Sequence, residues 1–229
     1  MSQDHPGGVD GRDDDATGDR AEVGVGPWPG GEPVWPRLGT GPEAPLDPRY
    51  DPQLLAEGDR RNVVDRYRYW TVEAVVADLD TRRHPFHVAI ENWAHDLNIG
   101  SVVRTANAFA AEQVHIVGRR RWNRRGAMVT DRYQHLMHHP DVEHLTAWAA
   151  ESGLPLVGVD NLPGSVPIDD YPLPRACVLL FGQESVGLSD AAREACVDVL
   201  HIRQFGSTRS INAGAAAAIA MYAWIGRHA

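Results

Sequence analysis

The fold is indicated most clearly by residues 176–188, which read ACVLLFGQESVGL. The residues from Ala176 to Phe181 are apolar without a break, and Gly182 and Gly187 bracket the polar segment that follows. An unbroken apolar run of this length is typical of a strand that is buried on both faces of a parallel sheet. Glycines directly after such a strand permit sharp turns and a close approach of backbone to a ligand. The stretch therefore predicts a central strand that opens into a binding loop.

Apolar strands alternate with helical patterns on both sides of this stretch. Short β-type runs cover residues 86–90, 114–117, 156–159 and 199–202, and helical spacing covers residues 100–111, 142–152, 190–196 and 210–225. This alternation is typical of an α/β fold in which helices flank a mostly parallel sheet. We therefore expect one α/β domain over residues 85–229.

The first part of the chain has a different composition. Residues 1–58 contain 9 of the 16 prolines and 11 of the 22 glycines, and they lack apolar periodicity. Such a segment buries too little apolar surface to offset its ordering entropy, so we predict a disordered, acidic Gly/Pro-rich tail over residues 1–45. Apolar residues at helical spacing between residues 59 and 80 predict a helical N-terminal extension over residues 46–84.

Charge and cysteine content limit the class of protein. The net charge is −9, but residues 1–60 alone carry 13 acidic side chains against 5 arginines, so the rest of the chain is close to neutral and can present a basic surface. All 22 basic residues are arginines, for which a genomic composition bias is the simplest explanation. Cys177 and Cys196 lie in or near apolar segments, which favours reduced thiols in a cytoplasmic protein. No run of 18 apolar residues occurs, and we expect no membrane association.

Two further blocks place polar groups beside glycine or small residues. Residues 98–106 read NIGSVVRTA, and Asn98 suits the N-cap of a helix. Arg104 lies about 1.7 turns further along that helix, where it either forms a structural ion pair or grips a phosphate or a developing oxyanion. Residues 206–212 read GSTRSIN, in which Ser210 can cap the last helix. In the loop after residue 181, the corresponding polar residue is Glu184, which is either a solvated turn residue or a functional carboxylate.

Taken together and in this order, the three blocks resemble the three motifs of the SpoU (TrmH-like) RNA ribose 2′-O-methyltransferases of the SPOUT superfamily. The resemblance covers about residues 86–226. It implies that the C-terminal part of the α/β domain forms a deep trefoil knot, that the protein is a homodimer, and that S-adenosyl-L-methionine is the cofactor. The implied reaction is methylation of a ribose 2′-hydroxyl in tRNA or rRNA.

The resemblance also implies roles for single residues. Asn98, Arg104, Glu184, Ser210 and Asn212 match the family's catalytic or substrate-site positions. Gly182, Ile202 and Ile211 match backbone contacts to the cofactor, and Leu180 and Gly187 stand with them in the cofactor-binding set. The sequence departs from the family where Ser185 replaces a common glycine, Ile211 replaces the usual leucine, and Ala213-Gly214 replaces a bulkier pair. None of these departures removes a polar group.

The family proposal makes the arginine of the first motif a general base, which here is Arg104. A guanidinium is nearly always protonated, so this role is physically awkward. We favour a role for Arg104 in orienting a phosphate and stabilising the forming alkoxide, with Asn98, Ser210 and Glu184 positioning Arg104 and the ribose.

Residues 119–125 read RRRWNRR and form the chain's one dense basic segment. Arginines beside a single aromatic residue suit phosphate contact combined with base stacking. We therefore expect RNA, and no DNA, to be bound by Arg119, Arg120, Arg121, Trp122, Arg124 and Arg125. The alternative is a solvated loop whose arginines pair with acidic neighbours.

Four histidines, at positions 135, 138, 139 and 144, are close together in the sequence. Pro140 interrupts any helical spacing among them and no cysteine is nearby, so we expect no metal site. We interpret them as a polar surface with one or two histidines facing RNA. A catalytically silent RNA-binding module on the same fold is the alternative to an enzyme. A dinucleotide-binding enzyme is disfavoured because the glycine fingerprint is missing.

Overall fold

The computed structural model describes residues 24–93, 98–183 and 186–229. At its centre is a seven-stranded sheet with the order β3-β2-β1-β6-β4-β7-β5, in which all the described strand pairs are parallel. The strands are β1 (Phe86–Asn92), β2 (Val114–Gly118), β3 (Leu136–His139), β4 (Leu156–Val159), β5 (Val166–Pro167), β6 (Cys177–Phe181) and β7 (Asp198–His201). The expected α/β class with a parallel sheet is confirmed.

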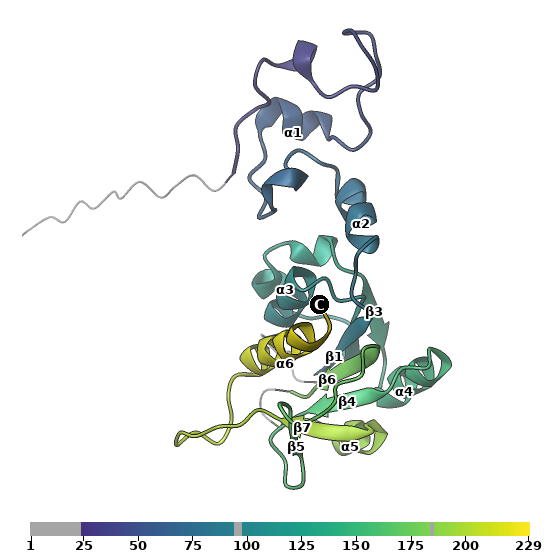
Figure 1. Ribbon diagram of the computed structural model, residues 1–229, viewed down its shortest axis with the longest axis vertical. Helices are drawn as coiled ribbons and strands as arrows, with labels where there is room; N and C mark the ends of the chain where they lie inside the picture. Colours follow the sequence, from purple (N-terminus) through teal and green to yellow (C-terminus); the bar gives the residue numbers. More distant parts are fainter. Residues whose placement is uncertain (1–23, 94–97, 184–185) are drawn as a thin grey trace, which may run out of the picture.

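Helices cover both faces of the sheet, as Figure 1 shows. The helices on the sheet are α3 (Ile99–Ala108) and α6 (Ala213–His228) on one face and α4 (Val142–Glu151) and α5 (Asp190–Ala195) on the other. Helices α1 (Pro52–Glu57) and α2 (Val72–Asp80) belong to the N-terminal extension. Successive residues of β1 point to opposite faces, so Val88 and Ile90 pack in the core beneath α3 and α6, and Ala89 packs in the core beneath α4 and α5. Among the described residues, no helix is both long enough and apolar enough to cross a membrane.

The strands and helices expected in the α/β domain are present to within a few residues at each end, but two strands were not foreseen. Strand β3 carries two histidines and strand β5 has 2 residues, so neither has the apolar pattern of a buried strand. Helix α6 begins at Ala213, later than expected, because Asn212 rather than Ser210 caps it: the Asn212 Oδ1 accepts the Ala215 N–H at 3.1 Å. The expectation that Ser210 caps the last helix is therefore wrong.

Part of the stretch expected to be a tail makes contacts with residues that follow it in the chain. Val25 forms an antiparallel bridge with Asp59, and the ring of Trp28 lies edge-on to Tyr50 and Tyr69, with centroids 5.9 and 5.2 Å apart. Aromatic edge-to-face contacts supply burial that a Gly/Pro-rich composition does not reveal. Residues 1–23 lie outside the described residues.

A buried arginine fastens the extension to the sheet domain. The side chain of Arg83, just after α2, is 2% exposed and pairs with Asp80 at 2.6 Å. Its guanidinium also donates to the Tyr133 carbonyl at 2.9 Å and to the Gln134 Oε1 at 3.1 Å. Because a buried charge is costly unless it is fully paired, this set of bonds fixes where α2 meets the segment that leads into β3.

Candidate ligand-binding and catalytic site

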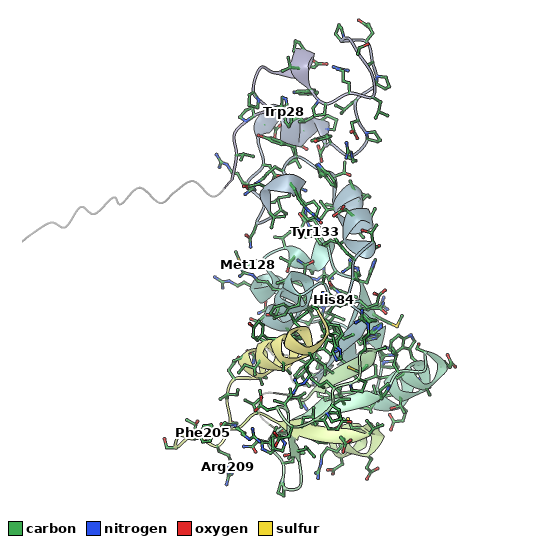
Figure 2. All side chains as sticks on the ribbon, viewed as in Figure 1. Trp28, His84, Met128, Tyr133, Phe205 and Arg209 are labelled. Atoms are coloured by element: carbon green, nitrogen blue, oxygen red, sulfur yellow. The ribbon has the colours of Figure 1, made fainter. Side chains whose placement is uncertain are left out.

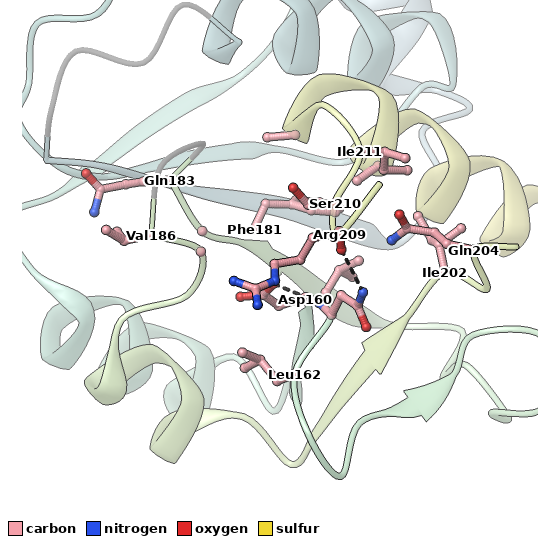
Figure 3. A pocket seen from close by; sticks show the side chains of 16 residues that line it. Asp160, Leu162, Phe181, Gln183, Val186, Ile202, Gln204, Arg209, Ser210 and Ile211 are labelled. Atoms are coloured by element: carbon pink, nitrogen blue, oxygen red, sulfur yellow. Dashed lines mark hydrogen bonds between the residues drawn. The ribbon is translucent and has the colours of Figure 1, made fainter. Parts of the chain in front are cut away.

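A cavity of about 250 Å³ lies where β4, β6 and β7 end. Its walls are the loops that follow these three strands, together with the start of α6, and Figure 3 shows their side chains converging on one space. Carboxyl ends of neighbouring parallel strands meet at one edge of a sheet, which is where ligands of such sheets bind. The loop expected from residues 176–188 is therefore one wall of a pocket.

Four of the five residues assigned to a cofactor by resemblance line this pocket: Gly182, Gly187, Ile202 and Ile211. Ser210, assigned to the catalytic set, lines it as well. Leu180 does not, because its side chain is fully buried in the core beneath α4 and α5. Glu184 lies outside the described residues.

The loop after β6 is closed by glycines that have no room for a side chain. Gln183 and Gly187 donate their N–H groups to each other's carbonyls at 3.1 and 2.9 Å. A Cβ on Gly182 would lie 2.0 Å from the carbonyl carbon of Gly187. A Cβ on Gly187, whose φ is +73°, would lie 2.2 Å from the Asp160 Oδ2. The pocket wall therefore requires glycine at both positions.

Two carboxylates hold the end of this loop from either side of β6. The Asp160 Oδ2, after β4, accepts the Leu188 N–H at 2.9 Å, and the Glu91 Oε2, on β1, accepts the Ser189 N–H at 2.8 Å. Glu91 is fully buried, and its other oxygen accepts the indole N–H of Trp93 at 2.8 Å. Neither residue is among those predicted from the sequence, although each is a carboxylate at the carboxyl end of an apolar strand, which is the available signal.

The first and third blocks meet through two asparagines. The Asn212 Nδ2 donates to the Asn98 Oδ1 at 2.9 Å, which joins the start of α3 to the start of α6. Asn98 stands at the N-cap position of α3 but makes no side-chain cap hydrogen bond, so its amide serves this contact instead. Gly214 lies beside this bond, and a Cβ on it would lie 3.2 Å from the Asn212 Oδ1.

Arg104 lies on the exposed side of α3 and does not line the pocket of its own chain. Within the described residues its guanidinium has no hydrogen-bond or ion-pair partner. Arg104 therefore forms no structural ion pair with any described residue. Its charge is available to an external anion.

The basic segment 119–125 is anchored next to the first block. The buried Asn92, at the end of β1, donates to the carbonyls of Arg119 and Arg121 at 2.7 and 2.9 Å. Gly100 packs against the following turn, since a Cβ on it would lie 2.7 Å from the Ala127 nitrogen. The segment is therefore held against α3 by its backbone.

The arginine side chains of this segment point to solvent. Arg119, Arg120, Arg121, Arg124 and Arg125 are all exposed. Arg124 lies over the ring of Trp122 at 5.6 Å and pairs with Asp131 at 3.3 Å; it is the one arginine of the five with an acidic partner among the described residues. Trp122 is half-buried and packs against the core, so only part of its ring is open.

Of the four clustered histidines only His139 lies in a buried row, with His87 and His115, whereas His135 and His144 are exposed. His115 Nε2 lies 3.1 Å from His87 Nδ1, and His115 Nδ1 lies 2.9 Å from His139 Nε2, across β1, β2 and β3. The ring of Trp148 on α4 covers all three. Burial lowers the pKa of His87 to about 4 and that of His115 to about 2. The interpretation of His139 as part of a polar surface is therefore wrong, and the described residues contain no group of three side chains that could hold a metal ion.

A parallel α/β sheet with a glycine-closed pocket at its carboxyl edge defines a class of ligand-binding α/β proteins. Comparison with known proteins narrows that class. The profile described as "SpoU rRNA Methylase family" matches residues 85–222. The chain belongs to this family.

The curated relatives carry related names. A protein of Mycolicibacterium vanbaalenii named "Uncharacterized tRNA/rRNA methyltransferase" is 30% identical over 186 residues, which cover 76% of this chain and 58% of that protein. A protein of the same name from Mycobacterium sp. strain KMS is 32% identical over 141 residues, which cover 58% of this chain and 44% of the relative. The chain thus spans about half the length of the curated relatives that it matches.

Two solved structures share the fold of this chain. The SpoU methyltransferase AviRb from Streptomyces viridochromogenes, in complex with AdoMet, is 25% identical with a TM-score of 0.57, over 66% of this chain and 60% of that one. The A. aeolicus TrmH/SpoU tRNA modifying enzyme has a TM-score of 0.59 at 18% identity, over 67% of this chain and 80% of that one, and its likeness concerns the fold alone.

Proposed function

We propose that this protein is an S-adenosyl-L-methionine-dependent methyltransferase that modifies a ribose 2′-hydroxyl in tRNA or rRNA. The observation that carries the proposal is the convergence of the three blocks. The second and third blocks line one pocket, and the hydrogen bond from Asn212 to Asn98 places the first block beside it. The structure of AviRb with AdoMet, a member of the same family, supports the choice of cofactor.

The pocket suits this cofactor in shape and chemistry. Leu162, Ile202 and Ile211 offer apolar surface to an adenine ring, and the glycine-closed loop exposes backbone at Gly182 and Gly187. When bound, the cofactor supplies an electrophilic methyl group on a sulfonium. The chain itself contributes a fixed position for that group relative to the RNA.

Polar residues beside the pocket and at its wall act on the RNA in this proposal. Asn98 and Asn212 form a hydrogen-bonded pair at the junction of α3 and α6 and orient the ribose. Arg104 orients a phosphate and stabilises the negative charge that develops on the ribose oxygen. Ser210, at the pocket wall, positions the ribose beside the cofactor. Glu184 remains in the proposed catalytic set on the resemblance alone.

The basic segment is the proposed RNA-binding surface. Four of its arginines have no acidic partner among the described residues, so their charges are available to phosphates. Replacing Arg120, Arg121 and Arg124 with alanine should weaken RNA binding about tenfold or more and reduce the slope of log affinity against log salt by about two to three. The measurement is a salt titration of RNA binding, with Arg203→Ala as a control. Unchanged affinity would contradict the assignment.

We also propose a homodimer, with the knotted chain path that the resemblance implies. Ile219 and Tyr222 on α6 are 42% and 66% exposed, and Phe109 lies beside Tyr222 with ring centroids 6.2 Å apart. Neighbouring apolar side chains on one exposed face suit a contact with a second copy. Tyr222→Arg should shift the mass measured by light scattering from dimer to monomer, whereas Tyr222→Phe should not. A wild-type mass equal to one chain would overturn the dimer.

The proposed reaction is tested by two measurements. Calorimetry should show that the protein binds S-adenosyl-L-methionine, and mass-spectrometric mapping should find a ribose methylation that is absent from cells lacking the gene. RNA binding without cofactor binding would instead favour the catalytically silent RNA-binding module. Mapping the methylated nucleotide also decides between tRNA and rRNA.

A further inference from the structure

Two side chains of opposite charge line the pocket, Asp160 and Arg209. They are the only charged residues among the described residues that line it. No ion pair joins them within 4.0 Å, and neither pairs with any other described side chain. Two unpaired opposite charges on one cavity are unusual, because they would lower their energy by pairing with each other unless a ligand comes between them.

The carboxylate of Asp160 is fixed in place but not saturated. Its Oδ2 accepts the Leu188 N–H at 2.9 Å, and its Oδ1 accepts the Asn161 N–H at 2.7 Å. An ionised carboxylate has about four acceptor sites, so these two bonds leave room for further donors. Asp160 therefore presents to the pocket a fixed carboxylate that still has hydrogen-bond acceptor sites to offer.

Arg209 has a tethered backbone and an untethered side chain. Its carbonyl accepts the Asn161 Nδ2 at 3.0 Å, which ties the loop before α6 to the residue next to Asp160. The side chain is exposed, and Figure 3 shows it extending across the pocket on the side of Asp160. The chain thus ties the backbone of Arg209 to the residue next to Asp160, while the guanidinium makes no bond to a described residue.

We infer that Asp160 and Arg209 recognise the α-amino-acid end of the cofactor, with the carboxylate of Asp160 holding its ammonium group and the guanidinium of Arg209 holding its carboxylate. A zwitterion carries both complementary charges on adjacent atoms, and a guanidinium can bind a carboxylate through two parallel hydrogen bonds. The adenine ring of the cofactor would then bind against the apolar side of the pocket. This inference rests on the proposed function, since it names the part of the same cofactor that two residues bind.

The test uses calorimetry to compare the affinities of two ligands for the wild-type protein and for its variants. It uses the full-length chain without RNA. The ligands are S-adenosyl-L-methionine and decarboxylated S-adenosyl-L-methionine, which lacks only the carboxylate. Wild-type protein should bind the first about tenfold more tightly, and Arg209→Gln should bind the two ligands equally. Arg203→Gln is the matched control, because Arg203 lies on the same connection but pairs with Asp169 at 3.3 Å outside the pocket; it should keep the wild-type preference.

A matching comparison tests Asp160. S-adenosylhomocysteine and its deaminated analogue differ by the ammonium group alone. Wild-type protein should prefer the first about tenfold, and Asp160→Asn should lose that preference. A mere shift of the loop that Asp160 holds would weaken both ligands equally and keep their ratio. The ratio of the two affinities therefore separates ligand recognition from loop support.

The outcomes are distinct. If Arg209→Gln and Asp160→Asn keep the wild-type preferences between ligands, the inference is overturned while the proposed function stands. If Arg209→Gln weakens only RNA binding, Arg209 is a phosphate contact and the inference is likewise overturned. If wild-type protein binds none of the four ligands, the proposed function itself fails, and the inference with it.

Discussion

The histidine row and the pocket are two polar regions of one apolar sheet, and they differ in which groups satisfy their polar atoms. In the row, His87, His115 and His139 bond to one another beneath Trp148, and both ring nitrogens of the central His115 are used in these bonds. In the pocket, the charges of Asp160 and Arg209 stay apart. A buried polar network that satisfies itself stabilises the fold, whereas polar groups that are held in place but unsatisfied indicate binding.

Backbone geometry separates the two regions as well. The three histidines of the row lie on regular parallel strands. The pocket wall is formed by glycines at positions where a side chain has no space. Figure 2 shows how far the connection that carries Phe205 and Arg209 projects from the sheet; Phe205 is 93% exposed. Substitutions at the glycines should therefore act on binding, and changes in the row should act on stability.

The largest expected effect comes from Gly182→Ala. The new Cβ would lie 2.0 Å from the Gly187 carbonyl carbon, so the loop must move and the pocket wall is displaced. We expect the affinity for S-adenosyl-L-methionine to fall by at least about a hundredfold, measured by calorimetry, which corresponds to about 3 kcal/mol.

Gly206→Ala is the matched control for Gly182→Ala. Gly206 lies in the connection to α6, its φ is not in the left-handed region, and a Cβ on it would meet nothing within 4 Å. This variant should keep wild-type affinity. Equal affinities of the two variants would contradict a pocket wall built by close glycine packing.

Arg104→Ala should have the next largest effect, on catalysis alone. Arg104 is exposed and has no partner within the described residues, so its loss should leave the midpoint of thermal unfolding unchanged. Loss of a charge that stabilises the developing alkoxide should lower kcat about a hundredfold or more. Arg104→Lys restores the charge but not the two-pronged geometry and should recover only part of the rate. A lysine variant with most of the rate and a new basic limb in its pH–rate profile would instead support the general-base role.

The pocket could be predicted from the sequence because its signals are local. Apolar strands end in glycines and polar residues at 182 and 187, and the carboxyl ends of parallel strands must meet at one edge. Asp160 and Glu91 escaped prediction because a single carboxylate after a strand is common. Their roles follow from hydrogen bonds to Leu188 and Ser189, which are 28 and 98 residues away in the sequence.

The histidine row could not be predicted, because it depends on the register between strands. His87 and His115 are each the second residue of a strand, and His139 is the last residue of another strand. The order of the strands in the sheet brings the three side chains together. The same holds for the extension, where the half-buried Trp28 packs against rings that lie 22 and 41 residues further along the chain, at Tyr50 and Tyr69. Contacts between distant segments leave no local pattern.

The smallest expected effect is a pH dependence of stability that originates in the row. Burial holds the pKa of His87 at about 4 and that of His115 at about 2, against an ordinary value of 6.5, so below pH 6.5 the unfolded chain binds more protons than the folded chain. Stability from these groups is therefore fully present above pH 6.5 and is lost as the pH falls toward 4. Each histidine contributes a slope of up to about 1.4 kcal/mol per pH unit.

Urea unfolding at several pH values measures this slope, and the same protein provides the control. Between pH 7 and 9 the histidines of the row are neutral in both the folded and the unfolded states. They should therefore not change the free energy of unfolding with pH in that range. The free energy of unfolding should then decline from pH 6.5 to 4, while cofactor affinity should follow stability only where unfolding becomes significant. A flat profile from pH 6.5 to 4 would mean that the row accepts protons while folded, and the contrast between a self-satisfied region and an open pocket would fail.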